Sequence, residues 1–245
     1  MKIDHIVLNI NPKYQTDNSI IEEIRKTGLL YKPENGKGTS GFKASNIWIG
    51  NEYFEMINIL KPDGGGWVHK WTNLYNKGHR GMICLMLDVD NIEGLYKNIR
   101  GKGIEISEPE WLEIKLFLNL FTKRMPWRNS YLPFFSEVPL QIGFQQLKDE
   151  KTRNFMNQRM NPNSTENGIK GIREIIIFGK FSDYDFDLLN IVFEHKAEEE
   201  GNRIKVLLNS NQKVIFEKSD NYNVIVKTES NYNKSTVIEN IKIMC

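Results

Sequence analysis

The sequence predicts an α+β fold made of three successive units, each a strand, a helix and a pair of strands. Three patterns support this: β-branched strands opening each unit, helix-capping residues after them, and tight-turn signals between the later strands. The units occupy residues 1–77, 78–148 and 169–245, and a polar connector containing Asn161-Pro162-Asn163 fills 149–168. Units of roughly seventy to eighty residues are typical of supersecondary modules rather than solenoid repeats.

The first unit shows all of these signals. Residues 2–10 are rich in β-branched side chains, which favours a strand. Capping residues at 16–19 and a glycine at 28 bracket an apolar helical pattern. The Gly50-Asn51 dipeptide is a tight-turn signal, so the flanking segments form a hairpin. The expected elements are therefore a strand over 2–10, a helix between 16–19 and 28, and strands over 42–49 and 53–60.

The second and third units follow the same order with weaker signals. Asn91 is the expected cap of a helix that ends at Gly101 or Gly103, and residues 111–124 fit neither helix nor strand cleanly, with both left open. The Glu198-Glu199-Glu200 run is typical of a solvated helix end or turn. The other expected elements are strands over 81–89, 127–136, 140–147, 172–178, 203–208, 213–218, 222–227 and 237–243, and a helix over 183–193.

Composition excludes several classes of protein. The 245 residues carry 33 Lys and Arg against 31 Asp and Glu, so bulk charge does not point to nucleic acid. No apolar stretch approaches the ~20 residues of a membrane span, and no signal sequence opens the chain. Cys84 lies in an apolar run and Cys245 is the last residue, which indicates a reducing compartment. We expect a cytoplasmic protein without nucleic-acid or membrane partners.

Two predicted strands of the first unit each carry one metal-capable side chain among apolar neighbours. These are His5 in the opening strand and Glu55 in the strand after Gly50. A histidine in such a strand is more often a satisfied core residue than a ligand. A carboxylate in an apolar barrel needs a metal, a cation or a hydrogen-bond donor, so Glu55 faces an ion or solvent, or pairs with Arg80, Arg124 or Arg128.

The ordered set of motifs resembles the glyoxalase-like domain family of the vicinal oxygen chelate superfamily, which includes glyoxalase I, bleomycin-resistance proteins and extradiol dioxygenases. The segments that carry the resemblance are Ile3-Asp4-His5-Ile6-Val7, Asn46-Ile47-Trp48-Ile49-Gly50, Tyr53-Phe54-Glu55-Met56-Ile57 and Leu132-Pro133-Phe134-Phe135-Ser136-Glu137. They cover residues 1 to about 150. The resemblance implies paired βαβββ modules forming an open barrel-like sheet over 1–148, with 169–245 as a degenerate third module.

The resemblance also implies a divalent metal (Zn, Ni, Co, Fe or Mn) ringed by inward side chains. By position His5, Glu55 and Glu137 match metal ligands, and the fourth position carries Met82, with His79 three residues earlier. Glu137 stands at a strand end, where carboxylates are commonly solvated. Such a protein is a metal-dependent lyase, isomerase or dioxygenase that chelates a small oxygenated substrate, with Glu55 or Glu137 moving the proton.

A metal-free alternative uses the same cavity to bind or sequester a small molecule. Aromatic side chains gather in the first two units, and Trp48, Tyr53 and Phe135 are the candidates to contact a planar ligand. Gly64-Gly65-Gly66 lacks the ending of a phosphate loop and fits a loop over the barrel mouth. In the third unit Glu174 stands where the first has His5. The sequence does not identify the substrate. It also leaves open whether the cavity is catalytic, binds a ligand without catalysis or is vestigial, and whether the chain forms a homodimer.

Overall fold

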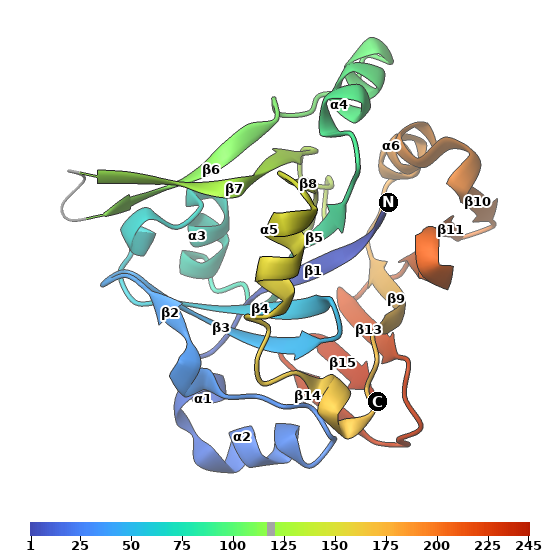
Figure 1. The fold of residues 1–245 in the computed structure, drawn as a ribbon. Coiled ribbons are helices and arrows are strands. Elements are labelled where there is room, and N and C mark those ends of the chain that lie inside the picture. Colours follow the sequence, from blue (N-terminus) through green and yellow to red (C-terminus); the bar gives the residue numbers. More distant parts are fainter. Residues whose placement is uncertain (117–120) are drawn as a thin grey trace.

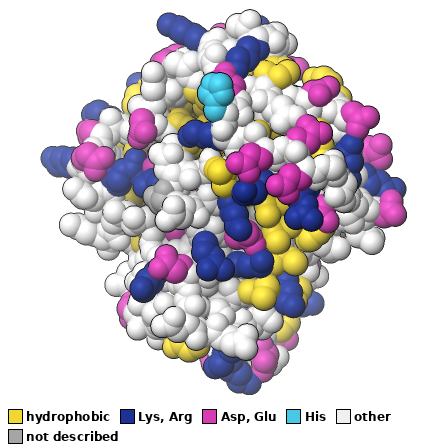
Figure 2. Space-filling view, turned by 90° about the vertical axis from the view of Figure 1, so that its right-hand side faces the viewer, with side chains coloured by type: hydrophobic (Ala, Val, Ile, Leu, Met, Phe, Trp, Pro, Cys, Tyr) yellow, Lys and Arg dark blue, Asp and Glu magenta, His cyan; other side chains and the backbone are white. Residues whose placement is uncertain are grey.

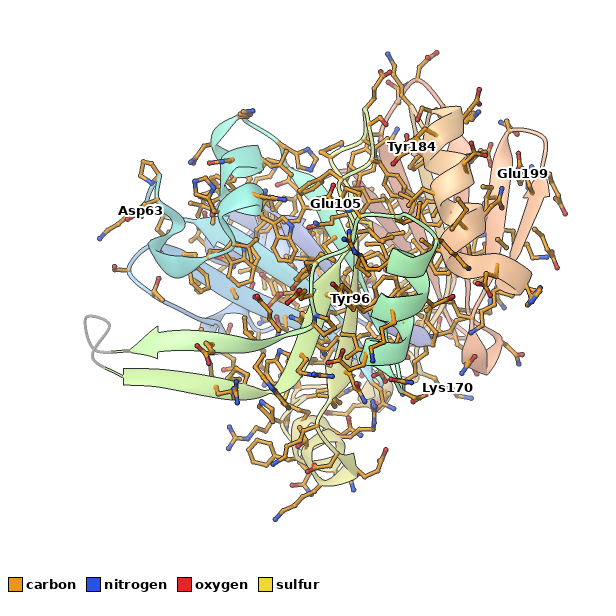
Figure 3. All side chains as sticks on the ribbon, turned by 90° about the horizontal axis from the view of Figure 1, so that it is seen from above. Asp63, Tyr96, Glu105, Lys170, Tyr184 and Glu199 are labelled. Atoms are coloured by element: carbon orange, nitrogen blue, oxygen red, sulfur yellow. The ribbon has the colours of Figure 1, made fainter. Side chains whose placement is uncertain are left out.

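A computed structural model describes residues 1–116 and 121–245, with side chains described outside 114–123 and 210. Its strands form two mixed sheets (Figure 1). The β6–β7 hairpin and the loop that carries Asp63 lie on one side of the molecule, and the second sheet, with Glu199, lies on the other side (Figures 1 and 3). None of the helices in the described part is long and apolar enough to cross a membrane.

The first sheet has the order β2-β3-β4-β1-β5-β8-β7-β6. In its centre β1 runs parallel to β4 and antiparallel to β5, and β5 runs parallel to β8. Two modules therefore join side by side along β1 and β5, which confirms the predicted paired βαβββ arrangement. The strands are β1 (Lys2–Asn9), β2 (Lys37–Gly38), β3 (Phe42–Ile49), β4 (Glu52–Ile59), β5 (Gly81–Asp88), β6 (Glu110–Leu116), β7 (Phe121–Tyr131) and β8 (Gln141–Leu147).

Helices begin where the sequence places capping side chains. The Asp17 carboxylate accepts from the Ser19 backbone N–H at the start of α2, and the Asn91 side chain accepts from Gly94 N–H at the start of α4. The α-helices are α1 (Lys13–Thr16), α2 (Asn18–Arg25), α3 (His69–Asn76), α4 (Ile92–Gly101), α5 (Glu150–Asn157) and α6 (Asp183–Phe193). The 3-10 turns are η1 (Pro33–Asn35), η2 (Gly64–Gly66), η3 (Ser164–Asn167), η4 (Glu194–Lys196) and η5 (Asn209–Asn211).

The second sheet repeats the topology of the first. Its order is β10-β11-β12-β9-β13-β15-β14, in which central β9 is parallel to β12 and antiparallel to β13, and β13 is parallel to β15. The third module is thus followed by a reduced fourth one, which has no helix between β13 and β14. The strands are β9 (Ile172–Gly179), β10 (Ala197–Glu200), β11 (Arg203–Leu207), β12 (Lys213–Lys218), β13 (Asn223–Thr228), β14 (Ser235–Ile238) and β15 (Ile241–Met244).

Several local expectations differ from the structure. The Glu198–Glu200 run is strand β10, since its backbone pairs with β11 while its side chains stay exposed. The single strand expected over 237–243 is the β14–β15 hairpin, which turns at Glu239 with φ 54°. The ambiguous segment 111–124 belongs to β6 and β7, and its residues 117–120 lie outside the described residues. The polar connector contains α5.

The two faces of β1 pack into two different hydrophobic clusters. Ile6 and Leu8 belong to a large core that also contains Ile175 and Ile177 of β9, so it binds the two sheets together. Val7 belongs to a smaller cluster on the opposite face, together with Trp71 and Met86. A register shift between Ile3 and His5 places Ile3 in the large core, although simple alternation predicts that it shares a face with His5.

Candidate functional site

A cavity of about 320 Å³ opens on the inner face of the first sheet, on the side of His5 and Val7. Every strand of the sheet except β2 contributes to it, together with η2 and the start of α3. Its lining residues are His5, Thr39, Phe42, Tyr53, Glu55, Gly65, Gly66, Trp67, Val68, Trp71, Met86, Leu112, Glu113, Trp127, Asn129, Tyr131 and Gln145. The predicted pair His5 and Glu55 therefore shares one cavity.

His5 is held in one orientation by its neighbours. Its Nδ1 atom bonds to the Asp4 carboxylate, and its ring stacks on Tyr53 with centroids 4.5 Å apart and planes 17° apart. The parallel pairing of β1 with β4 places Tyr53 directly beside His5. The other ring nitrogen, Nε2, lies 3.9 Å from Glu55 Oε2. A carboxylate on one nitrogen fixes the ring so that the other is presented to the cavity.

Glu55 is a carboxyl without a compensating cation among the described side chains. Its own burial raises its pKa, His5 partly offsets this effect, and the negative charge of Asp4 adds to it. The three arginines considered as partners lie elsewhere. Arg80 donates to the Tyr75 and His79 carbonyls, Arg124 pairs with Glu113, and Arg128 pairs with Glu93. This end of the cavity is therefore acidic.

One wall of the cavity is an arc of aromatic rings. Neighbouring centroids lie 4.8 Å apart for Phe42 and Trp67, 5.9 Å for Trp67 and Trp71, and 5.8 Å for Trp71 and Tyr131. The Trp71 indole N–H donates to Gln141 Oε1 at 3.0 Å, which fixes that ring. Trp67 and Trp71 come from the segment around α3, where the sequence predicts a loop. Trp71 lies in the first turn of α3, whereas Trp67 precedes the helix in extended backbone, so no helical spacing in the sequence indicates that their rings meet.

Two polar atoms in the lining have no hydrogen-bond partner among the described residues. They are the indole nitrogen Trp67 Nε1 and the amide oxygen Asn129 Oδ1, and both are buried. The other end of the Asn129 amide donates to the Tyr131 hydroxyl at 3.0 Å, which fixes the orientation of the side chain. Buried polar atoms are nearly always paired, so unpaired ones lining a cavity indicate groups that a ligand or water satisfies.

The remaining predicted site residues lie outside this lining. Glu137 is exposed, in the turn between β7 and β8. Phe135 is 5% exposed and packs on Phe181 and Phe216, with ring centroids at 5.2 and 5.9 Å, so it joins the first sheet to the second. Trp48 stands behind Tyr53, with centroids 4.4 Å apart, and therefore supports the His5–Tyr53 stack from outside the cavity.

The donor set does not fit the metal that the resemblance implies. Met86 rather than Met82 pairs with His5 across β1 and β5, and it offers only a thioether. Glu113 lies at the rim, where its half-exposed side chain pairs with Arg124. No group of three His, Cys, Asp or Glu side chains in the described ranges could hold an ion. A catalytic first-row metal takes about three protein donors, and here His5 and Glu55 supply two.

The second sheet has an ion-pair cluster at the corresponding place. Glu174 of β9 pairs in register with Lys213 and Lys227, just as His5 pairs with Tyr53 and Met86. Both lysine ammonium groups lie 2.5 Å from the buried Glu174 carboxylate. On this side of the molecule a hydrophobic strip is bordered by charged side chains (Figure 2). Lys213 and Lys227 thus balance the charge of Glu174, whereas no described lysine or arginine pairs with Glu55.

Comparisons with known proteins bear on the fold. No family model and no curated sequence matches the chain. A crystal structure of a hypothetical protein from Staphylococcus aureus is similar over 99% of this chain and 97% of that one, with a TM-score of 0.69 and 16% identity. Methylmalonyl-CoA epimerases also align. The Streptomyces coelicolor enzyme, in complex with 2-nitronate-propionyl-CoA, covers 61% of this chain and 99% of its own at TM-score 0.41 and 13% identity. The Mycobacterium tuberculosis enzyme covers 61% and 90% at TM-score 0.40 and 10% identity. The S. aureus structure shows that both sheets of this chain follow one known two-sheet fold.

Proposed function

We propose that this chain binds a small planar organic molecule in the cavity of its first sheet, as a metal-free protein of the glyoxalase-like type. The observation that carries the proposal is the cavity itself: about 320 Å³, walled by aromatic rings and closed at one end by His5 and Glu55. Small-molecule sites have this character, with a mostly apolar lining and a few fixed polar groups. Of the three aromatic residues that the sequence predicts to contact a ligand, Tyr53 lines the cavity.

A tryptophan-fluorescence titration tests this proposal. Naphthalene-sized ring compounds should quench the emission of protein purified without added metal, because Trp67 and Trp71 form the wall. The variant Trp67→Ala should lose binding, and the matched control Trp111→Ala, outside the lining, should keep it. Saturable binding that survives Trp67→Ala unchanged contradicts the proposal.

A second candidate function is proton transfer, favoured by the alignment of Asp4, His5 and Glu55. Asp4 orients His5, and Glu55 has a raised pKa that brings a carboxyl closer to neutral pH, where general bases work best. The expected signature is exchange of a carbon-bound ligand proton for deuterium, followed by NMR and lost in Glu55→Gln. A stoichiometric first-row metal that co-purifies with the protein and is lost in His5→Ala would instead support the metal-dependent lyase, isomerase or dioxygenase.

A further inference from the structure

The acidic end of the cavity lacks a positive partner in the described part of the chain. Glu55 has no hydrogen-bond donor there, and the one side chain within ion-pair distance of it is His5, 3.9 Å away. On the far side of His5 stands the Asp4 carboxylate, which pairs with the same ring. One imidazole therefore stands between two carboxyl groups, so when both of them are ionised the site is negative even with His5 protonated.

A buried carboxylate is costly unless a cation or hydrogen-bond donors reach it. Burial raises the pKa of Glu55, which is the direction expected for an unpaired carboxyl. Glu174 is the contrasting case in the same chain, because two lysines outweigh its burial and lower its pKa. Glu174 is the more buried of the two, with 6% of its side chain exposed against 21% for Glu55, which borders the cavity. The fold thus supplies two lysines to Glu174, whereas no described lysine or arginine pairs with Glu55.

The rest of the lining favours the same class of ligand. Tryptophan and tyrosine faces attract cations, by about 0.5–2 kcal/mol for each contact, and the cavity presents Trp67, Trp71 and Tyr131 in one arc. Of the two unpaired polar atoms, Asn129 Oδ1 is an acceptor that needs a donor from the ligand. Trp67 Nε1 is a donor, and it can satisfy one acceptor on the same molecule.

We infer that the ligand of this cavity is a flat organic cation, a one- or two-ring system bearing an ammonium, amidinium or ring-nitrogen charge. The inference deepens the proposed function and depends on it. The cation lies against Glu55, and the rings stack along the aromatic arc. The volume of about 320 Å³ lies at the lower end of small-molecule pockets, about 300–1,000 Å³, which limits the ligand to a small ring system.

Three ring probes of nearly equal shape separate charge from fit. N-methylquinolinium is the cation, 1-methylnaphthalene is its neutral isostere, and 1-naphthoate is the anion. Isothermal titration calorimetry on the full chain should show the cation binding at least about tenfold more tightly than the neutral probe, a difference of about 1.4 kcal/mol. The anion should bind most weakly, because it faces Glu55 in the lining and lies near Asp4 behind His5.

Charge-removing variants locate the origin of the preference. Glu55→Gln keeps the shape of the side chain and should reduce the affinity for the cation about tenfold while leaving the neutral probe unchanged. Asp4→Asn should weaken the preference in the same direction. The matched control Glu137→Gln, exposed and outside the lining, should change neither affinity.

The outcomes of these titrations distinguish failure of the cation inference from failure of the proposed binding function. A neutral probe that binds as tightly as the cation, or a cation preference that survives Glu55→Gln, overturns the cation inference and leaves the binding function standing. Failure of all three probes to bind overturns the binding function, and the cation inference falls with it.

Discussion

Glu52 should make the stability of this protein depend on pH across the neutral range. It opens β4 and lies in a second cavity of about 470 Å³, between the β3–β4 turn and the start of β9. Its carboxylate accepts from the Ile172 backbone N–H and from Gln212 Nε2, both at 3.1 Å. It therefore ties the first sheet to the second, and Gly171 beside it leaves room for the carboxylate, since an added Cβ would lie 2.9 Å from Oε2.

Burial raises the pKa of Glu52 to about 7 from an ordinary value of 4.5, and the two hydrogen bonds only partly oppose this effect. The folded state then holds the proton more tightly than the unfolded state, so stability falls as pH rises from about 4.5 to 7. The difference of 2.5 between the two pKa values corresponds to about 3 kcal/mol when it is fully expressed. Between pH 5 and pH 8 the expected loss is about 2 kcal/mol.

Urea unfolding at pH 5 and pH 8 measures this loss, with Glu52→Gln as the test variant. The free energy of unfolding of Glu52→Gln minus that of wild type should increase by about 2 kcal/mol from pH 5 to pH 8, so the variant becomes relatively more stable, because it has no carboxyl to ionise. The comparison cancels other titrating groups, which both proteins share. The matched control is Glu229→Gln, in the same cavity but 64% exposed, and it should follow wild type. Parallel pH profiles for wild type and Glu52→Gln would refute the reasoning.

Three further predictions concern packing, charge and the cavity wall. Phe135→Ala should lower the free energy of unfolding by about 3–5 kcal/mol in urea melts, because its ring joins the two sheets, while Phe155→Ala at a 47% exposed ring should cost less than about 1 kcal/mol. Glu174→Gln should lower the free energy of unfolding by about 1–3 kcal/mol at pH 7. This difference should shrink below pH 4.5, because two lysines lower the pKa of Glu174 against its burial and their contribution to stability is lost as pH falls. Gly143→Ala should weaken probe binding in calorimetry, because its methyl group would press on the sulfur of Met86, which lines the cavity; unchanged affinity would contradict this packing of Met86.

Local chemistry explains why so many elements could be predicted. Capping by Asp17 and Asn91 depends on side chains within three residues of the helix start, and both helices begin there. The Gly50-Asn51 turn joins β3 to β4 as expected, with Gly50 at φ 62°. Repetition of these local signals predicted the paired modules. The weakest local signals mark the errors, such as the acidic strand β10, which forms only because β11 is available to pair with it.

The candidate site was predictable only in part. His5 and Glu55 share a cavity because strand alternation and module order bring them to one inner face, and both are readable from sequence. The wall formed by Trp67 and Trp71 depends on α3 folding back across the sheet, a long-range contact that no local pattern encodes. Glu137 lies outside the lining because the chain leaves β7 at Tyr131, earlier than the sequence indicates.

The sequence by itself determined the modules, their helices and the pairing of one histidine with one glutamate, because these follow from periodicity, capping and turns within a few residues. Only the tertiary structure decided what chemistry surrounds that pair. It placed a thioether opposite His5 and directed the three candidate arginines to other partners, and it left Glu55 in an aromatic-lined cavity without a described lysine or arginine partner. The physical reason is that the charge balance of a cavity depends on side chains far apart in the chain.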